Sequence, residues 1–183
     1  YKRQDFGIEI DGYTFNPSLF KKNGAKDYIE YSKKIIEKCN SKPVSLEVFA
    51  DDEKQMIDQA IILDSLGSNV FVKIPITFTN KEYTSNVLSN LVDKNIKLNI
   101  TAIFTMNQVK KILPVVKSTS SILSVFAGRI FDCGLDANKL MSEISTVIKG
   151  ESKCQLLWAS PRMPYDLSLI HISDPTTLHG ISE

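Results

Sequence analysis

The sequence predicts an α/β fold built on a parallel sheet, because short apolar runs alternate with amphipathic helical patterns along most of its 183 residues. The apolar runs are nearly continuous and rich in β-branched residues, which is typical of parallel strands covered on both faces. The alternation allows either a closed (β/α)8 TIM barrel or an open doubly wound sheet. No GxGxxG or GxxxxGK[ST] motif is present, so a nucleotide-binding open sheet lacks its main signature.

Six short apolar segments are expected to be the strands. In chain order they are 11–15 (DGYTF), 44–50 (VSLEVFA), 69–76 (NVFVKIPI), 98–104 (LNITAIF), 122–128 (ILSVFAG) and 156–160 (LLWAS). The first is the weakest, and it ends at the dipeptide Asn16-Pro17.

Helical patterns fill the intervals between these strands, with apolar residues at the 3.6-residue period. They cover about 26–39, 56–64, 83–92, 105–113 and 136–148. Thr105 and Gln108 have the spacing of a capping box, and Asp136 is a suitable first cap for the last helix. Gly67 and Gly150 are expected to end the helices before them.

The composition is that of an ordinary globular protein, with 43% hydrophobic and 23% charged residues, and the length suggests one domain. The net charge of +1 gives no electrostatic reason to expect nucleic acid or a membrane surface as a partner. No apolar run approaches the ~20 residues that span a bilayer. Cys39, Cys133 and Cys154 form no CxxC pair, which favours the reducing cytoplasm.

Polar residues interrupt the apolar strands at regular intervals. Glu47, Lys73, Asn99 and Ser124 are separated by 26, 26 and 25 residues, and Thr101 shares a strand face with Asn99. In a barrel, alternate side chains point inward, and the active site lies at the carboxyl ends of the strands. We therefore expect a carboxylate, an amine, an amide and hydroxyls to converge on one small volume.

Lys73 is the most informative of these residues. Burial disfavours the charged form of a lysine, and a neutral amine can attack a carbonyl carbon. A neighbouring carboxylate and hydroxyl can hold a water that shuttles protons. Taken alone, each polar residue could also be a strand-end group that reaches solvent, but polar groups in register on four consecutive units argue against that interpretation.

Two arginines follow expected strand ends. Arg129 comes just after the fifth strand, and Arg162 follows Ser160, which closes the sixth. Two guanidiniums at the mouth of a barrel suit a phosphorylated substrate, since the guanidinium fork matches phosphate oxygens. A solvated loop arginine is the alternative for each one alone.

At these residues the chain resembles the transaldolase family, whose members are Schiff-base aldolase-type barrels. The resemblance rests on six segments in family order: 14–19 (TFNPSL), 44–48 (VSLEV), 72–75 (VKIP), 98–102 (LNITA), 124–130 (SVFAGRI) and 159–162 (ASPR). It implies a (β/α)8 barrel that moves a dihydroxyacetone unit from sedoheptulose 7-phosphate or fructose 6-phosphate to an aldose phosphate. This is a step of the non-oxidative pentose phosphate pathway.

The resemblance also implies a role for each matching residue, and it implies sugar-phosphate substrates with no metal or organic cofactor. Lys73 would form the imine with the donor ketose, while Glu47 and Thr101 would hold the catalytic water. The remaining matching residues would bind the substrate: Asn16 and Asn99 its hydroxyls, Ser124, Ser160, Arg129 and Arg162 its other oxygens and phosphate, and Phe126 a wall of the pocket. A homo-oligomer is left open.

Two alternatives to a transaldolase remain. In the fructose-6-phosphate aldolase branch a glutamine replaces the water-binding glutamate and a tyrosine replaces the phenylalanine. Glu47 and Phe126 therefore favour the transferase. The other alternative, from a different class, is a catalytically silent barrel fragment that serves as a binding or scaffold piece. Phe15 stands where the family usually has threonine, which puts one hydroxyl contact in doubt.

The match to the family pattern is expected to be incomplete at both ends. Residues 1–162 are expected to form a partial barrel with family strands two to seven, and neither Asp5 nor Asp11 matches the acid of the family's first strand. Residues 163–183 show no pattern of the family's last strand and helix, so we expect either a tail foreign to the family or a divergent one.

We therefore expect the 183-residue chain by itself to be poorly stable and inactive, because a barrel without its first and last strands has two open edges. The measurement is cleavage of fructose 6-phosphate by the purified chain. Rapid cleavage would contradict this expectation.

Overall fold

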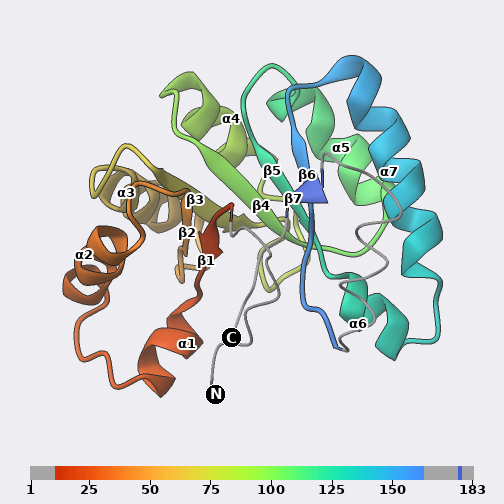
Figure 1. Ribbon diagram of the computed structural model, residues 1–183. Helices are drawn as coiled ribbons and strands as arrows, with labels where there is room; N and C mark the ends of the chain where they lie inside the picture. Colours follow the sequence, from red (N-terminus) through yellow and green to blue (C-terminus); the bar gives the residue numbers. More distant parts are fainter. Residues whose placement is uncertain (1–10, 163–176, 179–183) are drawn as a thin grey trace.

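The computed structural model describes residues 11–162 together with 177 and 178, and here it confirms the predicted α/β fold. One parallel sheet holds seven strands in sequence order, and it curls into part of a TIM barrel with helices around its outside (Figure 1). The strands are β1 (Tyr13–Thr14), β2 (Val44–Glu47), β3 (Val70–Pro75), β4 (Leu98–Ile103), β5 (Ile122–Val125), β6 (Gln155–Trp158) and β7 (Thr177–Leu178).

Strands β1 to β6 coincide with the six predicted segments, apart from their ends. Strand β7 was not predicted; it pairs parallel with β6 through Leu156 and Leu157. The rest of the predicted tail, 163–176 and 179–183, lies outside the described residues. So does Asp5.

Seven helices are described. They are α1 (Pro17–Lys22), α2 (Tyr28–Lys38), α3 (Glu53–Asp64), α4 (Ser85–Asp93), α5 (Met106–Val116), α6 (Ala127–Asp132) and α7 (Ala137–Glu151). The capping box of Thr105 and Gln108 is confirmed at α5, and Asp136 caps α7 through the amides of Asn138 and Lys139. Gly150 does not end α7, which continues to Glu151. None of the helices in the described part is long and apolar enough to span a membrane.

Two short helices were not predicted. The expected strand 122–128 ends at Val125, and Ala127 and Gly128 begin α6 instead. A short apolar run cannot be divided between strand and helix by periodicity, which explains the error. Helix α1 is too short to show a period, but Asn16 as its cap and Pro17 at its first position are a recognisable start signal.

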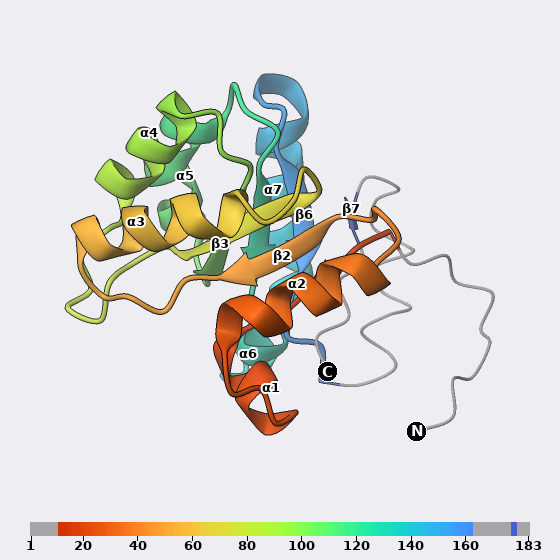
Figure 2. The ribbon, with the colours of Figure 1, turned by 90° about the vertical axis from the view of Figure 1, so that its left-hand side faces the viewer.

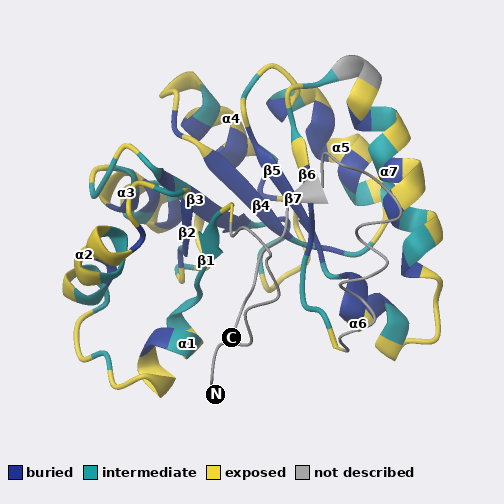
Figure 3. Cartoon of the chain, viewed as in Figure 1, coloured by how far each residue is buried: buried dark blue, intermediate teal, exposed yellow. Residues whose placement is uncertain are grey.

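The apolar core occupies both faces of the sheet. Strands β3, β4 and β5 are buried along nearly their whole length, while the outer surfaces of the helices are exposed (Figure 3). Helix α3 packs along β3 (Figure 2), and α2 contacts β2 through the hydrogen bond from the Tyr28 hydroxyl to the Glu47 carbonyl. A polar side chain in these strands has no easy access to water, so each one needs a partner inside the protein.

Candidate active site

The parallel register places three predicted site residues side by side. Glu47 on β2 pairs with Lys73 on β3, and Lys73 pairs with Asn99 on β4. The spacing of 26 residues therefore does correspond to one height on the sheet. Ser124 is an exception, because Ile122 is the partner of Asn99 and Ser124 lies two residues farther along β5. The register between β4 and β5 therefore offsets Ser124 from the row. The Ser124 hydroxyl nevertheless forms a hydrogen bond with Asn99.

Lys73 and Glu47 form a mostly buried ion pair. The distance from Lys73 Nζ to Glu47 Oε2 is 3.0 Å, and the two side chains are 11% and 20% exposed. Burial of either charge alone would be costly. At this short distance, the attraction between the two charges offsets the loss of their hydration. The pair stands where β2 ends and near the end of β3, on the carboxyl side of the sheet.

Tyr28 supports Glu47 from helix α2, a role that the sequence did not reveal. Its hydroxyl donates a hydrogen bond of 2.9 Å to the backbone carbonyl of Glu47. Burial, and next the negative charge of Glu47, raises the pKa of Tyr28 well above the usual phenol value. A phenol is protonated at neutral pH in any case, and the raised pKa keeps this one a donor in more alkaline solution as well. In the sequence Tyr28 is only one aromatic position of an amphipathic helix.

Asn99 is fully buried and is held at both ends of its carboxamide. Ser124 Oγ donates to Asn99 Oδ1 at 2.6 Å, and Asn99 Nδ2 donates to Ser45 Oγ at 2.9 Å. Ser45, also buried, was not predicted as a site residue. Its position two residues before Glu47 on the same strand face was the available signal.

Thr101 lies deep in β4, with 1% of its surface exposed. Among the described residues its hydroxyl Oγ1 has no hydrogen-bond partner. The next residue, Ala102, has a φ of 59°, and the β4–β5 register shifts between Ile100 and Ile103. This bulge turns the end of β4, as bulges near functional sites often do. A buried hydroxyl without a protein partner is suited to a water or a ligand.

Asn16 lies just past the end of β1 and has a structural task. Its Oδ1 accepts a hydrogen bond of 2.8 Å from the amide of Leu19 and so caps α1. The preceding residue, Phe15, joins the backbone of β2 at Ser45. The amide NH2 of Asn16 is the part that a ligand could use.

Phe126 and Arg129 form a stacked unit after β5. The guanidinium carbon of Arg129 lies 4.7 Å from the centre of the Phe126 ring, a cation–π distance. The ring itself packs edge-on against Phe104 at 5.5 Å. Phe126 thus has a ring on one side and a cation over it, which fixes its orientation.

Arg162 is paired with Asp132 at the end of α6. Its Nε and Nη2 lie 2.9 Å and 2.8 Å from Asp132 Oδ2. Arg129 and Arg162 therefore contact different partners, and these contacts alone do not join them into one anion site. Asp132 was not predicted; its place three residues after Arg129, one turn along the helix, was the only signal.

Ser160 meets α6 through its backbone. A Cβ added to Gly128 would lie 1.8 Å from the carbonyl oxygen of Ser160, so only glycine allows this approach. Ser160 itself has a φ of 62°, in the left-handed region. The contact sets the path of the segment that carries Arg162.

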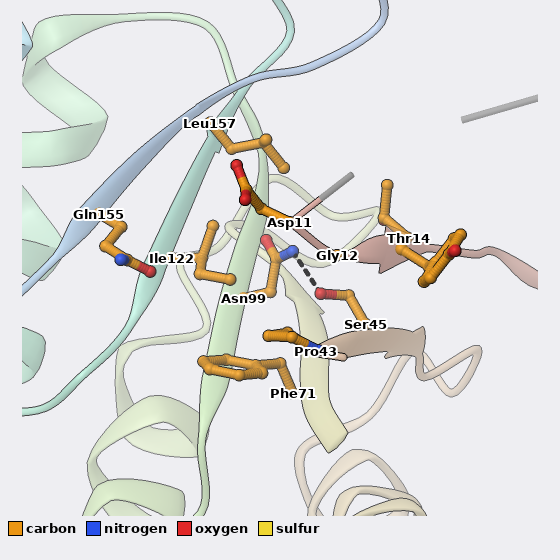
Figure 4. Close-up of a pocket in the computed structure, with 11 residues that line it drawn as sticks. Asp11, Gly12, Thr14, Pro43, Ser45, Phe71, Asn99, Ile122, Gln155 and Leu157 are labelled. Carbon is orange, nitrogen blue, oxygen red and sulfur yellow. Dashed lines mark hydrogen bonds between the residues drawn. The ribbon is translucent and has the colours of Figure 1, made fainter. Parts of the chain in front are cut away.

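A cavity of about 130 Å³ lies at the opposite, amino end of the strands. Its lining residues include Phe71, Ile122, Leu157, Ser45 and Asn99 (Figure 4). Ser45 and Asn99 line this mostly apolar space, whereas Lys73, farther along β3, and Glu47 do not.

These contacts define a class of protein: a parallel (β/α)-barrel fold with a buried lysine–carboxylate pair at the carboxyl side of its strands. The family described as Transaldolase/Fructose-6-phosphate aldolase matches residues 6–178. The chain belongs to this family. The roles assigned to the individual site residues remain predictions.

Several relatives support the same assignment, each bearing the name "Probable transaldolase". The one from Methanococcus maripaludis is 39% identical over 156 residues, which is 85% of this chain and 68% of the relative. The one from Thermoplasma volcanium is 36% identical over 163 residues, covering 87% and 69%. The one from Brucella ovis is 34% identical over 161 residues, covering 86% and 69%.

Substitution of Gly128 by alanine is expected to displace the segment 159–162. The added methyl collides with the Ser160 carbonyl, and such overpacking costs about 1–3 kcal/mol. The measurements are the free energy of unfolding in urea and hydrogen–deuterium exchange of that segment. Gly134→Ala is the control for the exchange measurement, because its Cβ would meet nothing within 4 Å; its φ of 75° strains alanine there, a cost that helical Gly128 does not share. Equal exchange in both variants would contradict the proposed packing role.

Proposed function

We propose that this protein is a transaldolase that acts through a Schiff base on Lys73. It would transfer a dihydroxyacetone unit from sedoheptulose 7-phosphate or fructose 6-phosphate to an aldose phosphate, in the non-oxidative pentose phosphate pathway. The single observation that carries the proposal is the 3.0 Å contact between Lys73 Nζ and Glu47 Oε2, inside a barrel-type sheet. Family membership supports it.

The first chemical step is the attack of the neutral Lys73 amine on C2 of the ketose. The C2 oxygen leaves as water and an imine forms, which draws electrons from the neighbouring bonds. Glu47 is close enough to accept a proton from the amine before the attack. No other group is needed to make the carbon electrophilic.

The second step is the cleavage of the C3–C4 bond. We propose that a water held between Glu47 and the unpartnered hydroxyl of Thr101 removes the proton of the C4 hydroxyl. The electron pair of the broken bond moves to the imine nitrogen, and the aldose leaves. The resulting enamine attacks the aldehyde of the acceptor, and water then releases the new ketose from Lys73.

Substrate binding is proposed for the residues around this centre. Asn16 and Asn99 would contact donor hydroxyls, and Ser124 and Ser160 other oxygens. Phe126 would form one wall. Arg129 and Arg162 would bind the phosphate, Arg162 after exchanging Asp132 for it, since a half-exposed ion pair of this kind is weak.

The cellular context is also a proposal. Cys39, Cys133 and Cys154 are all free, which supports a reducing compartment such as the cytoplasm. The partners proposed are sugar phosphates, with assembly into a homo-oligomer left open.

Lys73 is expected to be the residue labelled when fructose 6-phosphate is added to the full-length protein and the imine is reduced with borohydride. Mass spectrometry of the digest locates the adduct. Lys73→Met should abolish the label, while Lys111→Met, a change at an exposed lysine of α5, should leave it intact. A label elsewhere, or none, would refute the Schiff-base mechanism.

The requirement for an acceptor distinguishes a transaldolase, which transfers the donor unit, from an aldolase, which releases it. With fructose 6-phosphate alone, the donor unit should remain on the protein and glyceraldehyde 3-phosphate should appear in about one equivalent. Addition of erythrose 4-phosphate should then give steady turnover. Steady release of dihydroxyacetone without an acceptor would instead favour the fructose-6-phosphate aldolase reaction.

A further inference from the structure

The carboxamide of Asn99 is the most enclosed polar group at the site. Its residue is 0% exposed, and Ser45 and Ser124 bind its two ends. Ser124 comes from the adjacent strand β5. Ser45 comes from β2, so the Asn99–Ser45 bond bypasses β3, the strand that carries Lys73. A bond between alternate strands must cross the inner side of the curled sheet.

The geometry points to Ser45 as a positioning residue that acts through Asn99. Its hydroxyl holds the Asn99 amide nitrogen, and thereby sets which part of the carboxamide is presented toward Lys73. The proposal rests on the proposed function for its catalytic consequence, because Asn99 is there a ligand of the donor ketose. Ser45 itself is not assigned any contact with substrate.

The Asn99 carboxamide can form further hydrogen bonds besides those to Ser45 and Ser124. A carboxamide has two N–H hydrogens and two acceptor positions on its oxygen. Ser45 takes one hydrogen and Ser124 fills one acceptor position, so among the described residues one of each has no partner and can serve the hydroxyls of a sugar. A donor and an acceptor held in one orientation match the alternating hydroxyl groups of a ketose.

Ser45 is the described side chain that accepts from Asn99 Nδ2, and other polar side chains that line the cavity, Asp11, Thr14 and Gln155, make no hydrogen bond to Asn99. The cavity there is lined largely by carbon, including the side chains of Phe71, Ile122 and Leu157 (Figure 4). When the Ser45 hydroxyl is removed, Asn99 Nδ2 loses its acceptor and faces a mostly apolar space. The carboxamide must then rotate or lose its single orientation, because an unpaired buried donor is costly.

The same cavity provides a matched pair of variants. Ser45→Ala removes the hydroxyl. Ser45→Thr keeps it and adds a methyl group, for which the cavity of about 130 Å³ has room. Threonine is also well suited to a strand. Ser121→Ala is the control, because it deletes another buried hydroxyl. That hydroxyl lies 2.7 Å from Thr119 Oγ1, on the residue just before β5.

Steady-state kinetics of the full-length protein provide the first test. In Ser45→Ala, kcat/KM for the donor fructose 6-phosphate should fall about tenfold, the scale expected when one buried hydrogen bond at a reacting centre is lost. The KM for the acceptor should not change. Ser45→Thr and Ser121→Ala should keep the wild-type values. Equal effects on donor and acceptor, or a loss in Ser121→Ala of the same size, would overturn the proposal.

The coupling to Asn99 provides the second test. In an Asn99→Ala background, Ser45→Ala should lower kcat/KM by less than about twofold, since a residue that acts through Asn99 has nothing left to position. The full tenfold loss in that background would show an independent role and overturn the proposal.

A third measurement does not depend on any activity. The side-chain NH2 signals of Asn99 in 15N NMR spectra report its hydrogen bonding. Ser45→Ala should shift and broaden them, and Ser121→Ala should not. If the protein forms no imine on Lys73, the proposed function fails, yet these signals still decide whether Ser45 orients Asn99. Unchanged Asn99 signals in Ser45→Ala would refute the positioning role.

Discussion

The parallel register of β2, β3 and β4 is the constraint on which the site depends. It puts Glu47, Lys73 and Asn99 in one row. Because strand side chains alternate between the two faces, a slip of one residue on β3 would move Lys73 into the layer of helices. The amine would then be buried without its carboxylate, at a cost of several kcal/mol. The fold and the ion pair therefore require each other.

The two ends of the proposed site differ in how firmly they are held. The lysine end is buried, and its groups are joined by short hydrogen bonds among residues of four adjacent strands. At the arginine end, Arg162 and Asp132 are about half exposed, with side chains 46% and 50% accessible. An ion pair of that kind contributes about 0–1 kcal/mol, so it can open for a phosphate. In the proposed mechanism, reaction and phosphate binding would thus fall to different parts of the structure.

The sequence predicted the strands and the row of polar residues because both follow from a period that repeats along the chain. It also predicted that Lys73 and Glu47 would meet. It could not reveal Ser45 as the partner of Asn99, since the two are 54 residues apart and on strands that are not neighbours. The cap of α1 by Asn16 was missed although Asn16-Pro17 is a start signal, and the pairing of Arg162 with Asp132 could not be predicted. Those contacts depend on how the short helices α1 and α6 turn, and neither has a recognisable period.

The proposed conversion of the ketose carbonyl into an imine on Lys73 is measured most directly by oxygen exchange. Imine formation releases the C2 oxygen as water, and the reverse reaction takes its oxygen from the solvent. In water enriched in 18O, without an acceptor, the full-length protein should catalyse incorporation of 18O at C2 of fructose 6-phosphate, and Lys73→Met should not. Cleavage of the C3–C4 bond without any oxygen exchange at C2 would contradict the account.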